Sequence, residues 1–120
     1  MRKRVHILVL AALICAGPRL VEAHAYLDRA SPRVGNTVTP APREVVLWFT
    51  QKLEPTFSSI EVRNEQGASV TASKATVVGD RTQMRVSLKS LTPGTYKVFW
   101  RVLSVDTHRT EGNFTFRVGP

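Results

Sequence analysis

Residues 93–108 read PGTYKVFWRVLSVDTH, and this run carries the strongest structural signal in the chain. Its Pro-Gly pair is typical of a turn, because proline presets one backbone angle and glycine accepts a positive φ. Beyond the turn, every second side chain is large and apolar, which is the period of a half-buried strand. The pattern predicts a long strand over residues 96–105, with a core face that carries Tyr96, Val98, Trp100 and Val102.

Shorter alternating runs lie on both sides of this strand and are separated by turn residues. We expect six more strands, at residues 26–30, 44–50, 58–63, 68–78 (broken), 82–88 and 113–118. About seven short strands without an amphipathic helix predict an all-β sandwich. Residues 31–42 contain three prolines and are expected to form an ordered connection along a sheet edge. The core faces should include Val45, Leu47, Phe49, Ile60, Val62, Met84, Val86, Leu88, Phe114, Phe116 and Val118.

The first residues have the pattern of an export signal. A basic segment at positions 2–4 precedes an apolar run over 5–16, which is too short for a permanent membrane anchor. Val21 and Ala23 supply the small residues that signal peptidase reads before its cleavage point. We expect cleavage after Ala23, with cleavage after Ala16 as the alternative. Residues 1–23 would then be a signal peptide, and residues 24–120 would form one domain with one modest core.

Charge and cysteine content exclude several classes of function. The whole chain carries 17 Lys and Arg against 9 Asp and Glu, and removal of the signal leaves 13 against 8, a net charge of +5. The remaining basic residues are scattered along the sequence without a run, so nucleic-acid binding is not expected. Cys15 lies in the signal and is the only cysteine. The mature chain therefore has no disulfide, and it has no thiolate for a zinc-finger, iron–sulfur or blue-copper site.

Two histidines remain after cleavage, because His6 lies in the signal. His24 would become the N-terminal residue, and its α-amine and imidazole can close a chelate ring on one metal ion once the amine has lost its proton. His108 follows Asp106 by two positions, a spacing that puts both side chains on one face of an extended segment. The pair follows the long strand, where a strand end or loop can also present both groups to one point. One amine, two imidazoles and one carboxylate suit Cu(II). An Asp-x-His pair can also be an ordinary surface loop.

Together, four motifs resemble the CopC family of exported copper-resistance proteins. They are HAYLDRASP at 24–32, LWFT at 47–50, the run at 93–108 ending in Ser-x-Asp-x-His, and GNFTF at 112–116. The resemblance covers nearly all of the mature chain. It implies a Greek-key β-sandwich of the immunoglobulin-like or cupredoxin-like kind. It also implies one Cu(II) ion bound by the amine and imidazole of His24, the imidazole of His108 and a carboxylate oxygen of Asp106.

The mature chain has no second hydrophobic segment, so we expect it to be soluble, and its modest apolar content favours a monomer. Because the ligand set leaves little room for open-site catalysis, we expect a periplasmic copper-binding protein without enzyme activity. Such a protein would sequester copper or pass it to an inner-membrane copper transporter of the CopD type. Some family members have a Cu(I) site in a Met-rich loop, but Met84 is the only mature methionine here, so we expect no Cu(I) site. Gln51 stands where the family often has an acidic residue near the copper, and Glu54 and Glu111 are the substitutes considered.

Two other functions remain open at this stage. An N-terminal histidine with a second histidine also resembles the histidine-brace centre of copper oxidases and monooxygenases. Against this, Asp106 would fill the position that oxygen needs in such an enzyme. The other alternative is an immunoglobulin-like binding module without a metal, in which replacing His24 and His108 would leave partner binding unchanged.

Overall fold

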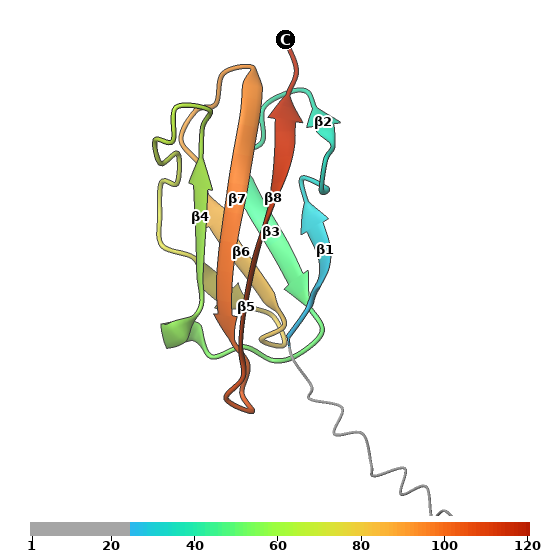
Figure 1. Cartoon of the computed structure of the whole chain (residues 1–120), viewed down its shortest axis with the longest axis vertical. Helices are drawn as coiled ribbons and strands as arrows, with labels where there is room; N and C mark the ends of the chain where they lie inside the picture. The colour runs from blue at the N-terminus through green and yellow to red at the C-terminus, as the bar shows by residue number, and fades with distance from the viewer. Residues whose placement is uncertain (1–24) are drawn as a thin grey trace, which may run out of the picture.

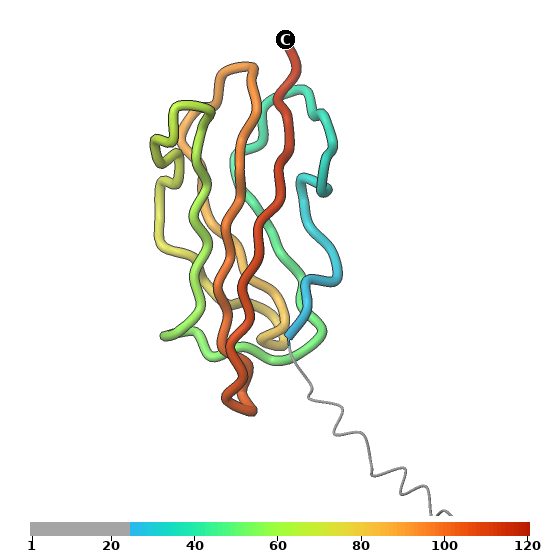
Figure 2. Tube along the Cα trace, in the orientation of Figure 1, coloured from blue at the N-terminus to red at the C-terminus, as the bar shows by residue number. Residues whose placement is uncertain are grey.

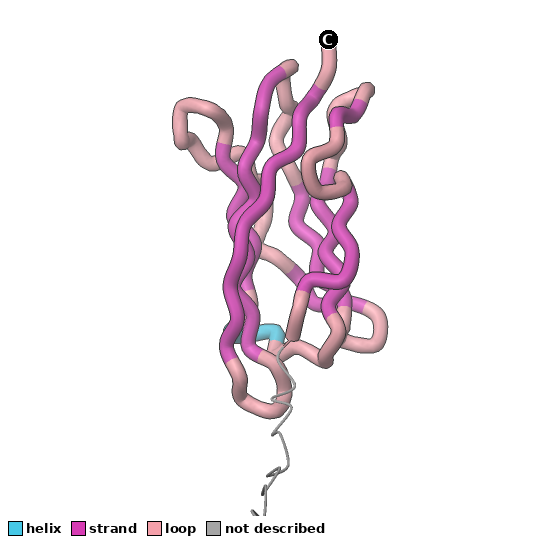
Figure 3. Tube along the Cα trace, turned by 45° about the vertical axis from the view of Figure 1, so that its right-hand side comes forward, coloured by secondary structure: helices cyan, strands magenta, loops and turns pink. Residues whose placement is uncertain are grey.

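The computed structural model describes residues 25–120, which form two four-stranded sheets packed face to face (Figures 1 and 3). The first sheet has the order β1 (Leu27–Ser31), β3 (Glu44–Phe49), β6 (Gln83–Ser87), β5 (Thr76–Val78). The second has the order β2 (Thr37–Val38), β8 (Arg109–Val118), β7 (Gly94–Leu103), β4 (Ser59–Arg63). A single 3₁₀ turn, η1 (Pro55–Phe57), precedes β4. The chain passes repeatedly from one sheet to the other, as in Greek-key sandwiches, and the predicted all-β sandwich is confirmed. Within residues 25–120 no helix is long and apolar enough to cross a membrane.

The hairpin of β7 and β8 dominates the second sheet. Its two strands pair in antiparallel register from Gly94 opposite Val118 to Leu103 opposite Arg109. The strand predicted over 96–105 is therefore displaced toward the N-terminus by two residues. The strand predicted over 113–118 begins earlier, at Arg109, because pairing with β7 holds a polar segment that shows no alternation of its own. This displacement leaves residues 104–108 as the hairpin loop.

The remaining differences from the expected strands are small. An eighth strand, β2, lies within residues 31–42 and pairs in parallel with β8 at the sheet edge, which agrees with an edge connection. The broken strand predicted at 68–78 is indeed broken. It contains the short strand β5 and isolated bridges at Ser69 and Thr71.

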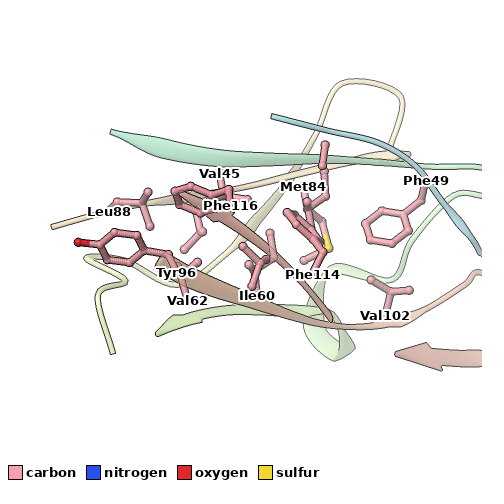
Figure 4. Close-up of a cluster of buried hydrophobic side chains, with 14 of the residues drawn as sticks. Val45, Phe49, Ile60, Val62, Met84, Leu88, Tyr96, Val102, Phe114 and Phe116 are labelled. Atoms are coloured by element: carbon pink, nitrogen blue, oxygen red, sulfur yellow. The ribbon is translucent and has the colours of Figure 1, made fainter. Parts of the chain in front are cut away.

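Alternation along the strands places the predicted apolar residues between the sheets (Figure 4). Tyr96 and Phe116 stack at 5.6 Å between ring centroids, and the Tyr96 hydroxyl donates to the Thr92 carbonyl at 2.6 Å. Met84 is fully buried in this core, as expected. Burying a large apolar side chain contributes about 1.5–3 kcal/mol to stability. The predicted core residues that are buried are Val45, Leu47, Phe49, Ile60, Val62, Met84, Val86, Leu88, Tyr96, Val98, Val102, Phe114, Phe116 and Val118.

Trp100 is the one predicted core residue that is only half-buried. Its ring meets Phe49 edge-on, with centroids 5.2 Å apart. Gly112 lies opposite Trp100 in the β7–β8 register, and a Cβ atom there would come within 2.5 Å of the indole ring. The absence of a side chain at position 112 therefore makes room for the indole.

The two ends of the described chain lie at opposite ends of the sandwich. The described chain begins at the end where the β7–β8 loop lies, whereas its C-terminus lies at the opposite end (Figures 1 and 2). The connection from β3 to β4, which includes η1, crosses the same end as the β7–β8 loop. The start of the described chain and the predicted Asp-x-His pair thus share one end of the fold (Figure 1).

Candidate metal centre

The β7–β8 loop, residues 104–108, carries two of the three predicted ligands. Two backbone hydrogen bonds close the loop: Ser104 N–H donates to the His108 carbonyl at 3.0 Å, and Thr107 N–H donates to the Ser104 carbonyl at 2.9 Å. Thr107 has a φ of 72°, in the left-handed region that non-glycine residues rarely adopt. Asp106 and His108 were expected to meet at a strand end or in a loop after the long strand. The structure places them in a loop, where a tight turn rather than an extended segment brings the two side chains together.

Asp106 and His108 approach each other closely. Their atoms Oδ2 and Nδ1 are 3.4 Å apart, and the two side chains are 41% and 40% exposed, so the pair is partly sheltered and still reachable from solvent. The Nδ1 atom of His108 is itself buried. The loop therefore holds an oxygen donor and a nitrogen donor side by side.

The side chain of Ser104 forms hydrogen bonds to both residues of this pair. Its side chain is fully buried at the end of β7, and its hydroxyl donates a hydrogen bond to Asp106 Oδ1. The Ser104 hydroxyl oxygen also accepts a hydrogen bond from the His108 backbone N–H at 3.3 Å. The hydrogen bond from Ser104 is the main reason why the pKa of Asp106 lies below its ordinary value, with His108 acting in the same direction and partial burial opposing both. Asp106 is therefore an ionised carboxylate at neutral pH, which is the form that binds metals.

The beginning of the described chain is attached next to this loop. Thr110 follows His108 by two residues, and its hydroxyl donates to the Ala25 carbonyl at 2.6 Å. Ala25 is fully buried. Tyr26 N–H donates to Thr50 Oγ1 and Thr50 N–H donates to the Tyr26 carbonyl, both at 3.0 Å. His24, the third predicted ligand, lies outside the described residues, but its covalent neighbour is held at the base of β8.

The donors in residues 25–120 do not make a complete metal site by themselves. No group of three or more His, Cys, Asp or Glu side chains that could hold a metal ion occurs in this part of the chain. Two ligand atoms in adjacent positions, each about 2.0–2.2 Å from one ion, lie about 3 Å apart. The 3.4 Å separation of Asp106 Oδ2 and His108 Nδ1 is close to that spacing, so the pair fits a shared ion with little movement. Such an ion needs further donors from outside the described residues.

Glu54 and Glu111, the two candidates to replace the acidic residue expected at position 51, both form ion pairs with arginines. The Glu54 carboxylate is paired with Arg81 at 3.4 Å, and the Glu111 carboxylate is paired with Arg101 at 3.2 Å. Glu111 faces outward on β8, opposite Arg101 on β7. Gln51 is half-buried and carries no charge. Asp106 is therefore the carboxylate in residues 25–120 that is best arranged to meet an ion beside His108.

A groove on the described residues lies away from this loop. It has a volume of about 630 Å³ and lies on the outward face of β4, β7 and β8, where Phe99, Arg101 and Glu111 line it. A metal ion is held by converging donor atoms and needs no large cavity. The groove and the candidate centre are thus separate features.

Sequence reasoning assigned no role to Ser104 or Thr110. Ser104 has the same parity as Val98, Trp100 and Val102, so a hydroxyl there interrupts the core face of β7 two residues before an aspartate. That interruption is a usable signal for a buried hydrogen-bonding group. Nothing comparable exists for Thr110, because its partner Ala25 lies 85 residues away.

Comparison with known proteins gives consistent matches over the whole sandwich. The profile of the CopC domain matches residues 27–119. Protein YobA of Escherichia coli (strain K12) is 39% identical over 102 residues, covering 82% of this chain and 81% of YobA. Copper resistance protein C of Xanthomonas campestris pv. juglandis is 37% identical over 103 residues, covering 80% of each chain. The crystal structure of CopC from Methylosinus trichosporium OB3b is similar with a TM-score of 0.75 and 35% identity, covering 81% of this chain and 95% of that chain.

Proposed function

The chain belongs to the CopC family of copper-resistance proteins, and we propose that it is an exported protein that binds one Cu(II) ion through His24, Asp106 and His108. In this proposal signal peptidase removes residues 1–23, and residues 24–120 form the copper-binding domain. The imidazole and α-amine of His24, the imidazole of His108 and the carboxylate of Asp106 are the donors. Nitrogen and oxygen donors of this kind favour Cu(II) over soft Cu(I).

The hydrogen bond between Thr110 and Ala25 is the observation that carries the proposal. Thr110 holds Ala25 through this hydrogen bond. Residue 24 is bonded directly to Ala25, and consecutive Cα atoms in a chain are about 3.8 Å apart. Thr110 is itself two residues from His108. We infer that an N-terminal histidine joined to Ala25 can reach the Asp106–His108 pair with its side chain, so that one site is shared by residues 84 positions apart in the sequence.

The charges and hydrogen bonds of the loop support binding without catalysis. The Asp106 carboxylate is ionised and held beside His108, so it is available as a ligand. With two imidazoles, an amine and a carboxylate around one ion, few positions are left for the open coordination that metal catalysis requires. We therefore propose that the protein sequesters Cu(II) in the periplasm as a monomer, or passes it to an inner-membrane transporter of the CopD type, and that it has no enzyme activity.

A second copper site for Cu(I) is not part of the proposal. Cu(I) prefers thioether and thiolate ligands. The mature chain has no cysteine, and Met84 is fully buried between the sheets. The proposed copper ligands are therefore limited to His24, Asp106 and His108.

A matched pair of aspartates tests the assignment. Asp80 and Asp106 both lie in loops and both accept a hydrogen bond from a hydroxyl two residues away, Thr82 for Asp80 and Ser104 for Asp106. We expect D106N to weaken Cu(II) binding by at least the 10- to 100-fold that loss of a supporting residue typically costs. D80N should bind Cu(II) like the unmodified protein. The measurement is a Cu(II) competition titration against a chelator of known affinity, on protein beginning at His24. Equal affinities for all three proteins would remove Asp106 from the site.

A further inference from the structure

We propose that Ser104 is a positioning residue for the copper site: its buried hydroxyl holds the Asp106 carboxylate and the His108 backbone in the arrangement in which both residues meet one ion. The inference rests on the proposed function. It concerns a side chain that need not touch the metal and that acts through two residues that do.

The burial of this hydroxyl is the first argument. Within residues 25–120 only two polar or charged residues are buried, Ser58 and Ser104, and Ser104 is 0% exposed. A hydroxyl in such a place costs stability unless it is hydrogen-bonded. The neighbouring core-facing residue of β7, Val102, is apolar and equally buried. A small apolar side chain would fill the same buried position at 104. We therefore infer that the hydroxyl is there for its hydrogen bonds and not for packing.

The partners of the hydroxyl show what that task is. Ser104 Oγ donates to Asp106 Oδ1, which directs the other oxygen, Oδ2, toward His108 Nδ1 at 3.4 Å. The same hydroxyl oxygen accepts the His108 N–H at 3.3 Å and lies 3.2 Å from the His108 carbonyl oxygen. One small group therefore contacts both ligand residues, the carboxylate of one and the backbone of the other. Groups that orient metal ligands in this way typically change metal affinity by 10- to 100-fold when removed.

The loop keeps its backbone closure without the hydroxyl. Ser104 N–H donates to the His108 carbonyl, Thr107 N–H donates to the Ser104 carbonyl, and Ser104 forms a bridge with Leu53. None of these contacts uses the side chain. The substitution S104A should therefore leave the hairpin folded and release only the carboxylate and the His108 amide. An aspartate that rotates freely must be ordered again when the ion binds, which weakens binding.

Ser58 provides a matched control. It is the other buried serine, and its hydroxyl accepts the Leu103 N–H at 3.2 Å, one residue before Ser104. The variant S58A thus removes a buried hydroxyl that binds the backbone of the same strand end. The structure gives this hydroxyl no hydrogen bond to Asp106 or His108. S104T is the rescue variant, because it keeps a hydroxyl at position 104.

The first measurement needs no copper. In metal-free protein beginning at His24, amide hydrogen exchange measured by NMR should show that the His108 N–H exchanges at least several-fold faster in S104A than in unmodified protein. S58A should leave the His108 rate unchanged and speed exchange at Leu103. Equal His108 rates in S104A and unmodified protein would show that the hydroxyl does not hold the loop, and this would overturn the inference whatever copper does.

The second measurement uses Cu(II) with a competing chelator, together with electron paramagnetic resonance spectra. We expect S104A to bind Cu(II) about 10- to 100-fold more weakly, with altered hyperfine splitting, whereas S58A keeps the affinity and spectrum of unmodified protein and S104T recovers most of both. Tight binding by unmodified protein with an unchanged S104A would overturn the role of Ser104 alone. An unmodified protein that binds no Cu(II) would overturn the proposed function, and Ser104 would then have a structural role only.

Discussion

The hydroxyl of Thr110 donates a 2.6 Å hydrogen bond to the carbonyl of Ala25, across 85 residues of sequence. It joins the first residue that the structure describes to the beginning of β8, just beyond His108. The proposed metal site depends on this contact, because it holds Ala25, the covalent neighbour of His24, next to the loop that carries Asp106. The contact makes Ala25, which is fully buried, part of the fold.

Replacing Thr110 with valine tests this attachment. T110V keeps the shape of the side chain and removes the hydroxyl, so the carbonyl of the buried Ala25 loses its partner. We expect the free energy of unfolding to fall by about 1–3 kcal/mol, and Cu(II) affinity to fall with it because the N-terminus is held less firmly. Urea unfolding and a Cu(II) competition titration measure the two effects.

Thr115 is the control for that substitution. It lies on the exposed face of the same strand, so T115V should change neither quantity by much. Unaltered copper affinity in T110V, despite lower stability, would mean that the Ala25 contact serves the fold and not the metal site.

Gly112 should be intolerant of even one extra carbon. An alanine Cβ there would meet the Trp100 ring at 2.5–3.1 Å, and Trp100 cannot move freely because it packs against Phe49. We expect G112A to lower the free energy of unfolding by about 1–3 kcal/mol, the usual cost of overpacking. Urea unfolding checks this, with the exposed neighbour variant N113A as the control. A G112A protein as stable as N113A would show that the indole has room to shift.

The turn between β5 and β6 gives a pH-dependent prediction. The pKa of Asp80 is lowered from its ordinary 3.8, first by the hydrogen bond from the Thr82 hydroxyl and then by the Thr82 N–H. A lowered pKa in the folded state means that this carboxylate stabilises the protein above the ordinary pKa. The contribution is lost as the pH falls from about 3.8 through the lowered value.

The substitution T82V should raise the pKa of Asp80 toward 3.8 and weaken this part of the acid dependence of stability. T82S, which keeps the hydroxyl, should preserve the lowered value. Carboxyl carbon NMR titrations of the three proteins measure the pKa directly. An Asp80 pKa that is the same in T82V and T82S would show that the hydroxyl has no part in the shift.

Alternation predicted the core well and the strand limits less well, for a physical reason. Runs such as Val45, Leu47 and Phe49 are buried because neighbouring side chains of a strand point to opposite faces. The segment from Arg109 to Asn113 has no such pattern, and only its pairing with β7 makes it a strand. The two residues of β2 are too few to show any period.

The arrangement of the candidate site was predictable in part. Asp106 and His108 could be paired from their spacing, but the turn with a positive φ at Thr107 that brings them together could not. The hydroxyl of Ser104 acts on residues nearby in sequence and left a trace, a polar residue on a core face. The attachment of Ala25 depends on a tertiary contact that leaves no local pattern.

The most direct test of the central claim is a Cu(II) titration followed by electron paramagnetic resonance on two proteins. One begins at His24, and the other carries a single extra residue before His24, which removes the α-amine from that histidine. We expect one tight type-2 Cu(II) equivalent in the first protein, and loss or severe weakening of that binding in the second. Equal binding by both proteins, or no binding by either, would contradict this claim.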